Sequence, residues 1–263
     1  MMFTWPYLIE ILTPARSSED KVEVLLDRFA ARCRRAIDSG CGVSIPDNPM
    51  GRPRYSAFEC FELVDYWPDP EKIVLNLNTF HSKEELDAVL QRAAEFGVRY
   101  LLIVRGDGGP RLPRLDPLSV GGTLNMATTM DLLSYINGEY GDQFITGSAF
   151  NPYKPMPFEL EKARKKLAAG ANFFITQPLL GKNEDVDSLS RICDYVIIEA
   201  WMSKNIELFY KSVGRIAMED PGSYDPPQNL SELHHAYPDT CVYLSMINFD
   251  QDWQNLLPRL TGG

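Results

Sequence analysis

Several polar residues stand inside or just after short apolar runs, where a side chain is well placed to act on a ligand. Glu10 lies within the apolar run of residues 7–12, and strand alternation would put it on the same side as Leu8 and Leu12. Burying a carboxylate in such a run is costly. Desolvation also disfavours the charged form, which leaves a proton donor near neutral pH. Taken alone, Glu10 fits a structural role as well as a chemical one.

Three charged or flexible residues, Arg105, Gly106 and Asp107, directly follow residues 100–104, the most hydrophobic run of the chain. A glycine at this place lets the backbone approach a ligand closely, and the two charges flank it. An internal ion pair at the start of a loop is the alternative. Asn78 ends another apolar run and is a candidate of the same kind.

Two further pairs of residues are candidates, one at the end of an apolar strand and one on a charged helix. Thr176 and Gln177 end the run of residues 172–176, and a terminal amide offers a donor and an acceptor together to the edge of a heterocycle. Lys162 and Lys166 are four residues apart, so one helix face would carry both toward a pyrophosphate. A solvated face paired with nearby glutamates is the commoner explanation.

The runs that carry these residues alternate with helical patterns along the whole chain. Strands are predicted at residues 7–12, 42–45, 73–78, 100–104, 143–150, 172–176, 195–199 and 242–246. Helices are predicted from residues 17–20 to about 39, and at residues 82–96, 128–136, 158–169, 185–192, 206–213 and 253–260. Eight alternations favour a closed parallel (β/α)8 TIM barrel over an open sheet. Such barrels carry their chemistry at the carboxyl ends of the strands.

Length and composition fit one α/β domain. Its 263 residues match the usual size of a single barrel, so residues 1–263 are expected to form one domain. Residues 214–240 contain four prolines and no clear strand, which predicts a long excursion before the last strand, as a lid or an interface.

The charge balance and the cysteines exclude several classes of function. A formal net charge of -10 opposes the phosphates of nucleic acids and anionic lipid headgroups. A local cationic spot could still hold an anionic cofactor. Five scattered cysteines without a C-x-x-C pair indicate reduced thiols, and three histidines argue against a multi-histidine metal site. Without an apolar run of ~20 residues or a signal-peptide pattern, we expect no membrane association and a cytoplasmic protein.

In order and spacing, four segments resemble the methylenetetrahydrofolate reductase family, and together they cover nearly the whole chain. The segments are residues 9–14, 101–107, 169–177 and 243–248. The most specific pieces are Arg-Gly-Asp after the fourth strand and Ala-Gly-Ala-x-x-x-Ile-Thr-Gln at the sixth. The resemblance implies an oxidoreductase that interconverts 5,10-methylene- and 5-methyltetrahydrofolate by hydride transfer.

The same resemblance implies roles for individual residues. Glu10 matches the acid that protonates N10, so that the five-membered ring opens to an iminium ion and hydride reaches the exocyclic carbon. Asp107 matches an aspartate near the flavin and the pterin, where its charge favours the cationic intermediate. Gln177 matches a glutamine that hydrogen-bonds the pterin, and Asn78 and Thr176 are the other expected substrate contacts.

For the cofactor, the resemblance implies FAD, with NAD(P)H or another hydride donor and tetrahydrofolate as the substrate. The expected cofactor contacts are Arg105, Gly106, Asp107, Phe150, Lys162 and Lys166. Several flavin positions depart from the family: its tyrosine and the histidine four residues later are Phe150 and Lys154, its threonine-tyrosine pair is Ser44-Ile45, and its histidine on the third strand is Asn76. Phe150 can still stack on a ring, and the lysines can still bind phosphate, so these changes are compatible with a bound flavin. Equally, a flavin-free reductase that takes hydride from a nicotinamide or deazaflavin donor would show such losses.

Two other functions fit the same residues. One is methyl transfer or demethylation, with the folate as methyl carrier and a corrinoid protein or another methyl donor as partner. The other is a non-catalytic folate-binding subunit of a larger complex, which the segment of residues 214–240 would suit. By analogy with the family, the chain is also expected to form a homo-oligomer or to join a partner protein of one-carbon metabolism.

Overall fold

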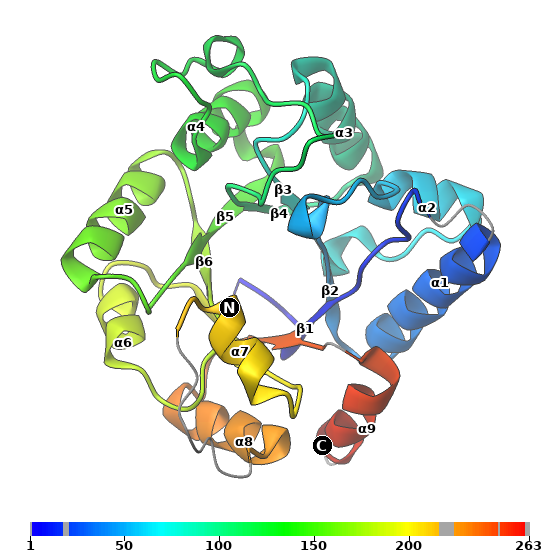
Figure 1. The fold of residues 1–263 in the computed structure, drawn as a ribbon, viewed down its shortest axis with the longest axis vertical. Helices are drawn as coiled ribbons and strands as arrows, with labels where there is room; N and C mark the ends of the chain where they lie inside the picture. The colour runs from blue at the N-terminus through cyan, green and yellow to red at the C-terminus, as the bar shows by residue number, and fades with distance from the viewer. Residues whose placement is uncertain (1, 18–20, 216–223, 247, 261–263) are drawn as a thin grey trace. The chain divides into compact units, whose positions relative to one another are not determined.

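The computed structural model describes residues 2–17, 21–215, 224–246 and 248–260. Its parallel strands close into a barrel in the order β1 to β8, which confirms the predicted (β/α)8 fold (Figure 1). The strands are β1 (Tyr7–Glu10), β2 (Gly42–Ile45), β3 (Ile73–Leu77), β4 (Tyr100–Ile103), β5 (Ile145–Phe150), β6 (Phe173–Thr176), β7 (Val196–Trp201) and β8 (Val242–Ser245). The helices are α1 (Val22–Asp38), α2 (Ala57–Leu63), α3 (Lys83–Phe96), α4 (Thr129–Tyr140), α5 (Met156–Ala168), α6 (Glu184–Ser190), α7 (Ile206–Ser212), α8 (Pro226–Ala236) and α9 (Phe249–Leu260).

The residues group into two compact units that interleave along the chain. One unit consists of residues 1–10, 149–163 and 173–263, and it holds β1, β6, β7 and β8. The other consists of residues 11–148 and 164–172, and it holds β2, β3 and β4. The expected single-domain organisation stays a prediction.

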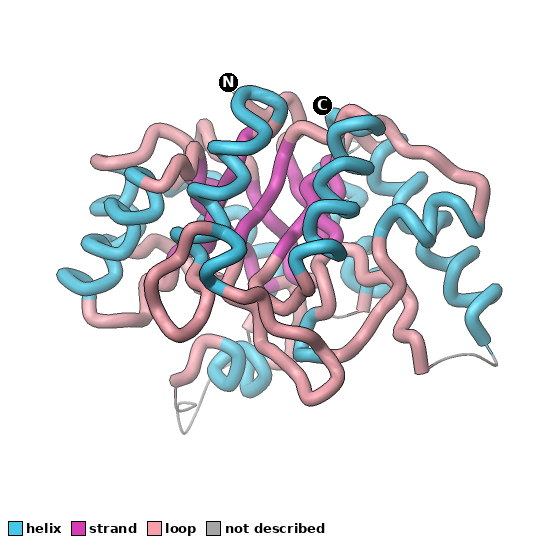
Figure 2. The backbone as a smooth tube through the Cα atoms, turned by 90° about the horizontal axis from the view of Figure 1, so that it is seen from above, coloured by secondary structure: helices cyan, strands magenta, loops and turns pink. Residues whose placement is uncertain are grey.

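Within the unit of β2 to β4, apolar strands pair in parallel and local signals set the helix ends. Ser44 lies opposite Val74, and every residue of β4 is buried, as expected for a strand covered on both faces. Helix α3 starts at a capping box between Ser82 and Glu85. It ends at Gly97, whose φ of 88° favours glycine. Figure 2 shows strands in magenta and helices in cyan.

Within the unit of β1 and β6 to β8, part of the segment predicted as a long excursion is helical. Residues 226–236 form helix α8, which buries Leu230 and Leu233. Pro226 lies in the first turn of this helix. A backbone N–H has no acceptor within the helix at that position, so a proline there costs no hydrogen bond. The proline content therefore did not mark an irregular loop there. Residues 216–223 of that segment, and residues 18–20 of the predicted start of the first helix, lie outside the described residues.

Two predictions about the whole chain can be compared directly with the structure. All five cysteines are free thiols, and four of them are buried, which confirms the prediction. In the part of the chain that the structure describes, no helix has the length and the apolar character needed to cross a membrane.

Candidate functional site

Glu10 ends β1 on the inner face of the barrel strands. The preceding Tyr7 places its hydroxyl 2.9 Å from Nε2 of His234 on helix α8, so Tyr7 faces the helix layer. Because side chains alternate along a strand, Leu8 and Glu10 turn to the opposite side. Glu10 is half-buried, and its Oε2 accepts a hydrogen bond from the Tyr243 hydroxyl on β8.

A second carboxylate, Glu199 on β7, belongs to the same group of strands. Its Oε1 accepts a hydrogen bond from the Ser245 hydroxyl, and the register places Glu199 directly opposite Tyr243. Tyr243 and Ser245 are two residues apart and share one face of β8. Each of the two β8 hydroxyls therefore binds one of the two glutamates.

The protonation of Glu199 differs from that of an ordinary glutamate. Desolvation raises the pKa of its carboxyl to about 8, against the lowering effect of the Ser245 hydrogen bond, and the negative charge of Glu10 raises it further. Burial and a like charge both disfavour the ionised form. The side chain keeps some solvent exposure, yet at neutral pH the protonated acid is the favoured form.

Thr176 and Gln177 lie at the end of β6 in the same unit, but they are used differently. The Thr176 hydroxyl is buried and accepts a hydrogen bond of 3.0 Å from the backbone N–H of Glu199. This hydrogen bond ties β6 to β7. The Thr176 hydroxyl therefore has a structural role besides its predicted role as a substrate contact. Gln177 is half-buried, and its backbone N–H donates to the carbonyl of Phe150 over 2.9 Å.

In the other unit, the loop after β4 packs closely on neighbouring loops. The side chains of Arg105 and Asp107 are exposed, and Asp107 Oδ2 accepts a hydrogen bond of 2.7 Å from the backbone N–H of Met50. Gly106 has a φ of 78°, and a Cβ there would lie 2.8 Å from the Cβ of Asn78. The glycine therefore serves close packing inside this unit.

Asn78 and His81 are both tied to Asp47, which follows β2. Asn78 is buried, and its Nδ2 donates to the Asp47 carbonyl over 2.9 Å and to Oδ2 over 2.8 Å. Nε2 of His81 lies 2.5 Å from the same Oδ2. Burial alone would lower the pKa of His81, but the hydrogen bond and the charge of Asp47 hold it above its usual value. The amide of Asn78, predicted to contact substrate, is occupied by the protein.

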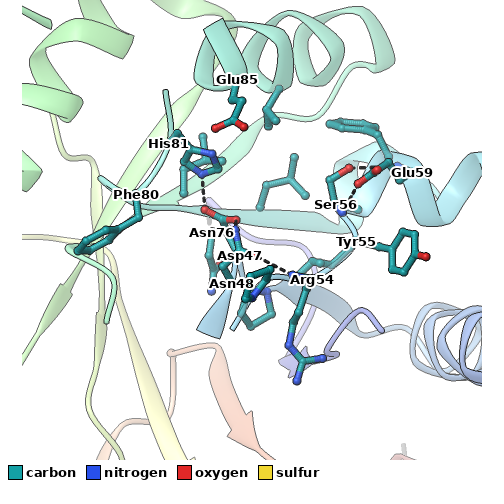
Figure 3. Close-up of a pocket in the computed structure, with 18 of the residues that line it drawn as sticks. Asp47, Asn48, Arg54, Tyr55, Ser56, Glu59, Asn76, Phe80, His81 and Glu85 are labelled. Carbon is teal, nitrogen blue, oxygen red and sulfur yellow. Dashed lines mark hydrogen bonds and ion pairs between the residues drawn. The ribbon is translucent and has the colours of Figure 1, made fainter. Parts of the chain in front are cut away.

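This ion pair lines a cavity of ≈ 520 Å³ within that unit (Figure 3). Much of its polar lining is already paired: Arg16 with Glu59 at 2.6 Å, and the guanidinium of Arg54 with the Thr13 carbonyl. Such paired charges stabilise the walls. They do not by themselves select a ligand.

Two of the predicted flavin contacts, Phe150 and Lys162, lie in one unit and have other partners. Phe150 is 1% exposed and meets Phe174 edge-on with ring centroids 6.5 Å apart, so its ring has no open face for stacking. Nζ of Lys162 lies 3.8 Å from Oε2 of the buried Glu159, whose charge opposes a pyrophosphate. These two residues therefore do not fit a flavin. In the other unit, Lys166 is buried, at 4% exposure.

The sequence patterns assigned no role to Glu199 and did not predict the pairing of Asp47 with His81. The signal for Glu199 was present, since it interrupts an apolar run just as Glu10 does. Only the register of β7, β8 and β1 brings the two carboxylates, Tyr243 and Ser245 into one cluster.

Comparison with known proteins gives one consistent family. The sequence model described as "Methylenetetrahydrofolate reductase" matches residues 72–206, just over half of the 263 residues. Methylenetetrahydrofolate reductase 2 of Saccharomyces cerevisiae is 30% identical over 118 residues, which are 42% of this chain and 18% of the yeast protein. Methylenetetrahydrofolate reductases 1 and 2 of Schizosaccharomyces pombe are 33% and 32% identical, each over 36% of this chain and 16% of their own length. The matched segments thus span less than a fifth of these relatives.

Proposed function

Because the chain belongs to the methylenetetrahydrofolate reductase family, we propose that it is a folate oxidoreductase that converts 5,10-methylenetetrahydrofolate to 5-methyltetrahydrofolate. The observation that carries the proposal is the carboxyl group of Glu10. It stands at the carboxyl end of β1, half-buried, with the Tyr243 hydroxyl bound to one oxygen. The working end of such barrels is the carboxyl end of the strands.

In this reaction Glu10 donates its proton to N10 of the substrate. The bond between N10 and the bridging carbon then breaks, and the positive charge moves to the iminium ion at N5. A bound reduced cofactor supplies the hydride that this carbon takes up. General-acid catalysis of this kind contributes about 10²- to 10⁴-fold in rate. The hydrogen bond from Tyr243 orients the carboxyl group.

Two more residues keep the roles that the family resemblance implies. Gln177, half-buried after β6, offers an amide donor and acceptor to the pterin. Asp107 supplies a negative charge that favours the cationic intermediate, and its bond from the Met50 N–H fixes the orientation of its carboxylate. FAD, expected from the family, is not carried into this mechanism, because Phe150 and Lys162 do not fit it. The visible absorption spectrum of the purified protein tests that point directly, since flavin bands would restore FAD.

The decisive variant is Glu10→Gln, which keeps the size and removes the proton. We expect the dissociation constant for folate, measured by the quenching of protein fluorescence, to stay within about threefold of wild type. The rate of 5-methyltetrahydrofolate formation should fall by about 10²-fold or more. The exposed Glu207→Gln on helix α7 is the matched control and should change neither quantity. NADH, NADPH and a reduced flavin are each supplied as donor.

Undiminished turnover by Glu10→Gln would remove the acid assignment. Wild-type turnover that requires a methylated corrinoid and oxidises no reduced cofactor would replace the reductase with a methyltransferase.

A further inference from the structure

One unit of the barrel holds a second acid besides Glu10, and the two acids stand on the two strands that flank β8. Tyr243 lies opposite Leu8 on β1 and opposite Glu199 on β7, so β8 separates the two glutamates by a single strand. Glu10 is two residues beyond Leu8 on the same face. The Tyr243 and Ser245 hydroxyls each bind one carboxyl group from this intervening strand.

We propose that Glu199 is a positioning residue that shares one proton with Glu10 and so keeps part of the Glu10 population protonated at neutral pH. This inference deepens the proposed function and rests on it for the substrate step. Glu199 acts through Glu10, and it is not assigned a contact with the folate.

The groups that face Glu199 favour one shared proton over two ionised carboxylates. From β8 the neutral hydroxyl of Ser245 donates a hydrogen bond to its carboxyl group, and from β6 the hydroxyl of Thr176 accepts a hydrogen bond from its backbone N–H. Tyr153, which follows β5, also interacts with its charge, and burial raises the pKa of this phenol, so Tyr153 stays neutral. Glu10 on β1 contributes the negative charge that acts on Glu199. Among the described residues, the groups that shift the pKa of this carboxyl include Ser245 and Glu10 but no cation.

Each proton in the proposed cycle has a source and a destination. When Glu10 protonates N10, its O–H bond breaks and an N–H bond forms. An O–H bond of Glu199 then breaks and one forms on Glu10. Glu199 finally takes a proton from solvent. No electrons move in these steps, so hydride transfer from the reduced cofactor stays a separate event.

Sharing one proton changes the pH dependence of the reaction in a defined way. A lone acid loses activity about tenfold for each pH unit above its pKa. In the pair, the singly protonated state keeps a constant fraction of Glu10 protonated until the second proton leaves. Since the pKa of Glu199 is raised to about 8, the alkaline side of the wild-type profile should stay shallow up to that pH.

The test compares pH profiles of kcat/KM for wild type, Glu199→Gln and Glu199→Asp. We expect kcat/KM of wild type, divided by that of Glu199→Gln, to grow with pH and to reach about tenfold or more by pH 8. Glu199→Asp should restore the shallow slope of the wild-type profile. Glu207→Gln serves as the control. A loss in Glu199→Gln that is the same at every pH would indicate a merely structural role and overturn the proposal.

A second readout needs no turnover. Infrared difference spectra of wild type minus Glu199→Gln should show the C=O stretch of a protonated carboxyl group at pH 7, and this band should disappear as the pH rises through about 8. An ionised Glu199 at pH 7 would overturn the proposal. A wild-type protein that has the band but does not reduce methylenetetrahydrofolate would leave the shared proton in place and remove the reductase instead.

Discussion

Two regions of this molecule each hold a half-buried carboxylate, and the two acids have different partners. Desolvation and the like charge of Glu10 raise the pKa of Glu199 to about 8, against the lowering effect of the Ser245 hydrogen bond. Asp47 meets the imidazole of His81 and the amide of Asn78, both of which donate to it. Its charge in turn raises the pKa of His81.

The difference teaches that depth alone does not decide the charge of a buried acid. At Asp47, the imidazole of His81 and the amide of Asn78 donate to the carboxylate, and an ion pair results. At Glu199, the hydrogen bond from Ser245 offsets only part of the effect of desolvation and of the like charge of Glu10.

The largest expected effect concerns the ion pair. Asp47→Asn leaves the buried imidazolium without its counter-charge, and we expect a loss of roughly 2–3 kcal/mol in the free energy of unfolding at pH 6, measured with urea. The folded pKa of His81 is raised, so this contribution is fully present below the unfolded pKa and fades as pH rises through the folded value.

The matched control for the ion pair is Asp87→Asn. Asp87 pairs with Lys83 on one helix face, and its side chain is 40% exposed, so the loss should stay below about 1 kcal/mol. Equal losses for Asp47→Asn at pH 6 and pH 9 would contradict a charged His81.

An effect of about the same size is expected for the stability of Glu199→Gln. The unfolded carboxyl ionises near 4.5 and the folded one near 8, so between these values the folded state keeps a proton that the unfolded state has lost. Wild-type stability should therefore fall as pH rises through this window. The advantage of Glu199→Gln over wild type should grow by roughly 2–3 kcal/mol between pH 4.5 and 8, below the full 1.4 kcal/mol per pKa unit because Glu199 is partly open to solvent. A difference independent of pH would show that Glu199 is ionised in the folded protein.

The smallest effect is expected when the single hydroxyl group of Ser245 is removed. The Ser245 hydrogen bond lowers the pKa of Glu199, so Ser245→Ala should raise that pKa slightly. Infrared titration of the protonated carboxyl band measures the shift. A fall in the pKa would mean that Ser245 supports the protonated acid, and would make the hydroxyl a proton acceptor in the cluster.

Much of the fold could be predicted because its signals are local. The apolar run at residues 100–104 produced β4, the capping residue Ser82 began α3, and Gly97 ended it. Helix α8 was missed because prolines in a first helical turn resemble those of a loop. Such errors arise where one residue type fits two local structures.

In the candidate site too, some features follow from the sequence and others only from the tertiary structure. The sequence by itself determined that Glu10 interrupts an apolar strand and shares a side with Leu8 and Leu12, since a period of two sets which strand residues share a face. Only the tertiary structure decided what each acid meets there. Tyr243 is 233 positions from Glu10, and Ser245 is 46 from Glu199. Strand register brings them together, and the charge of a buried acid depends on such neighbours.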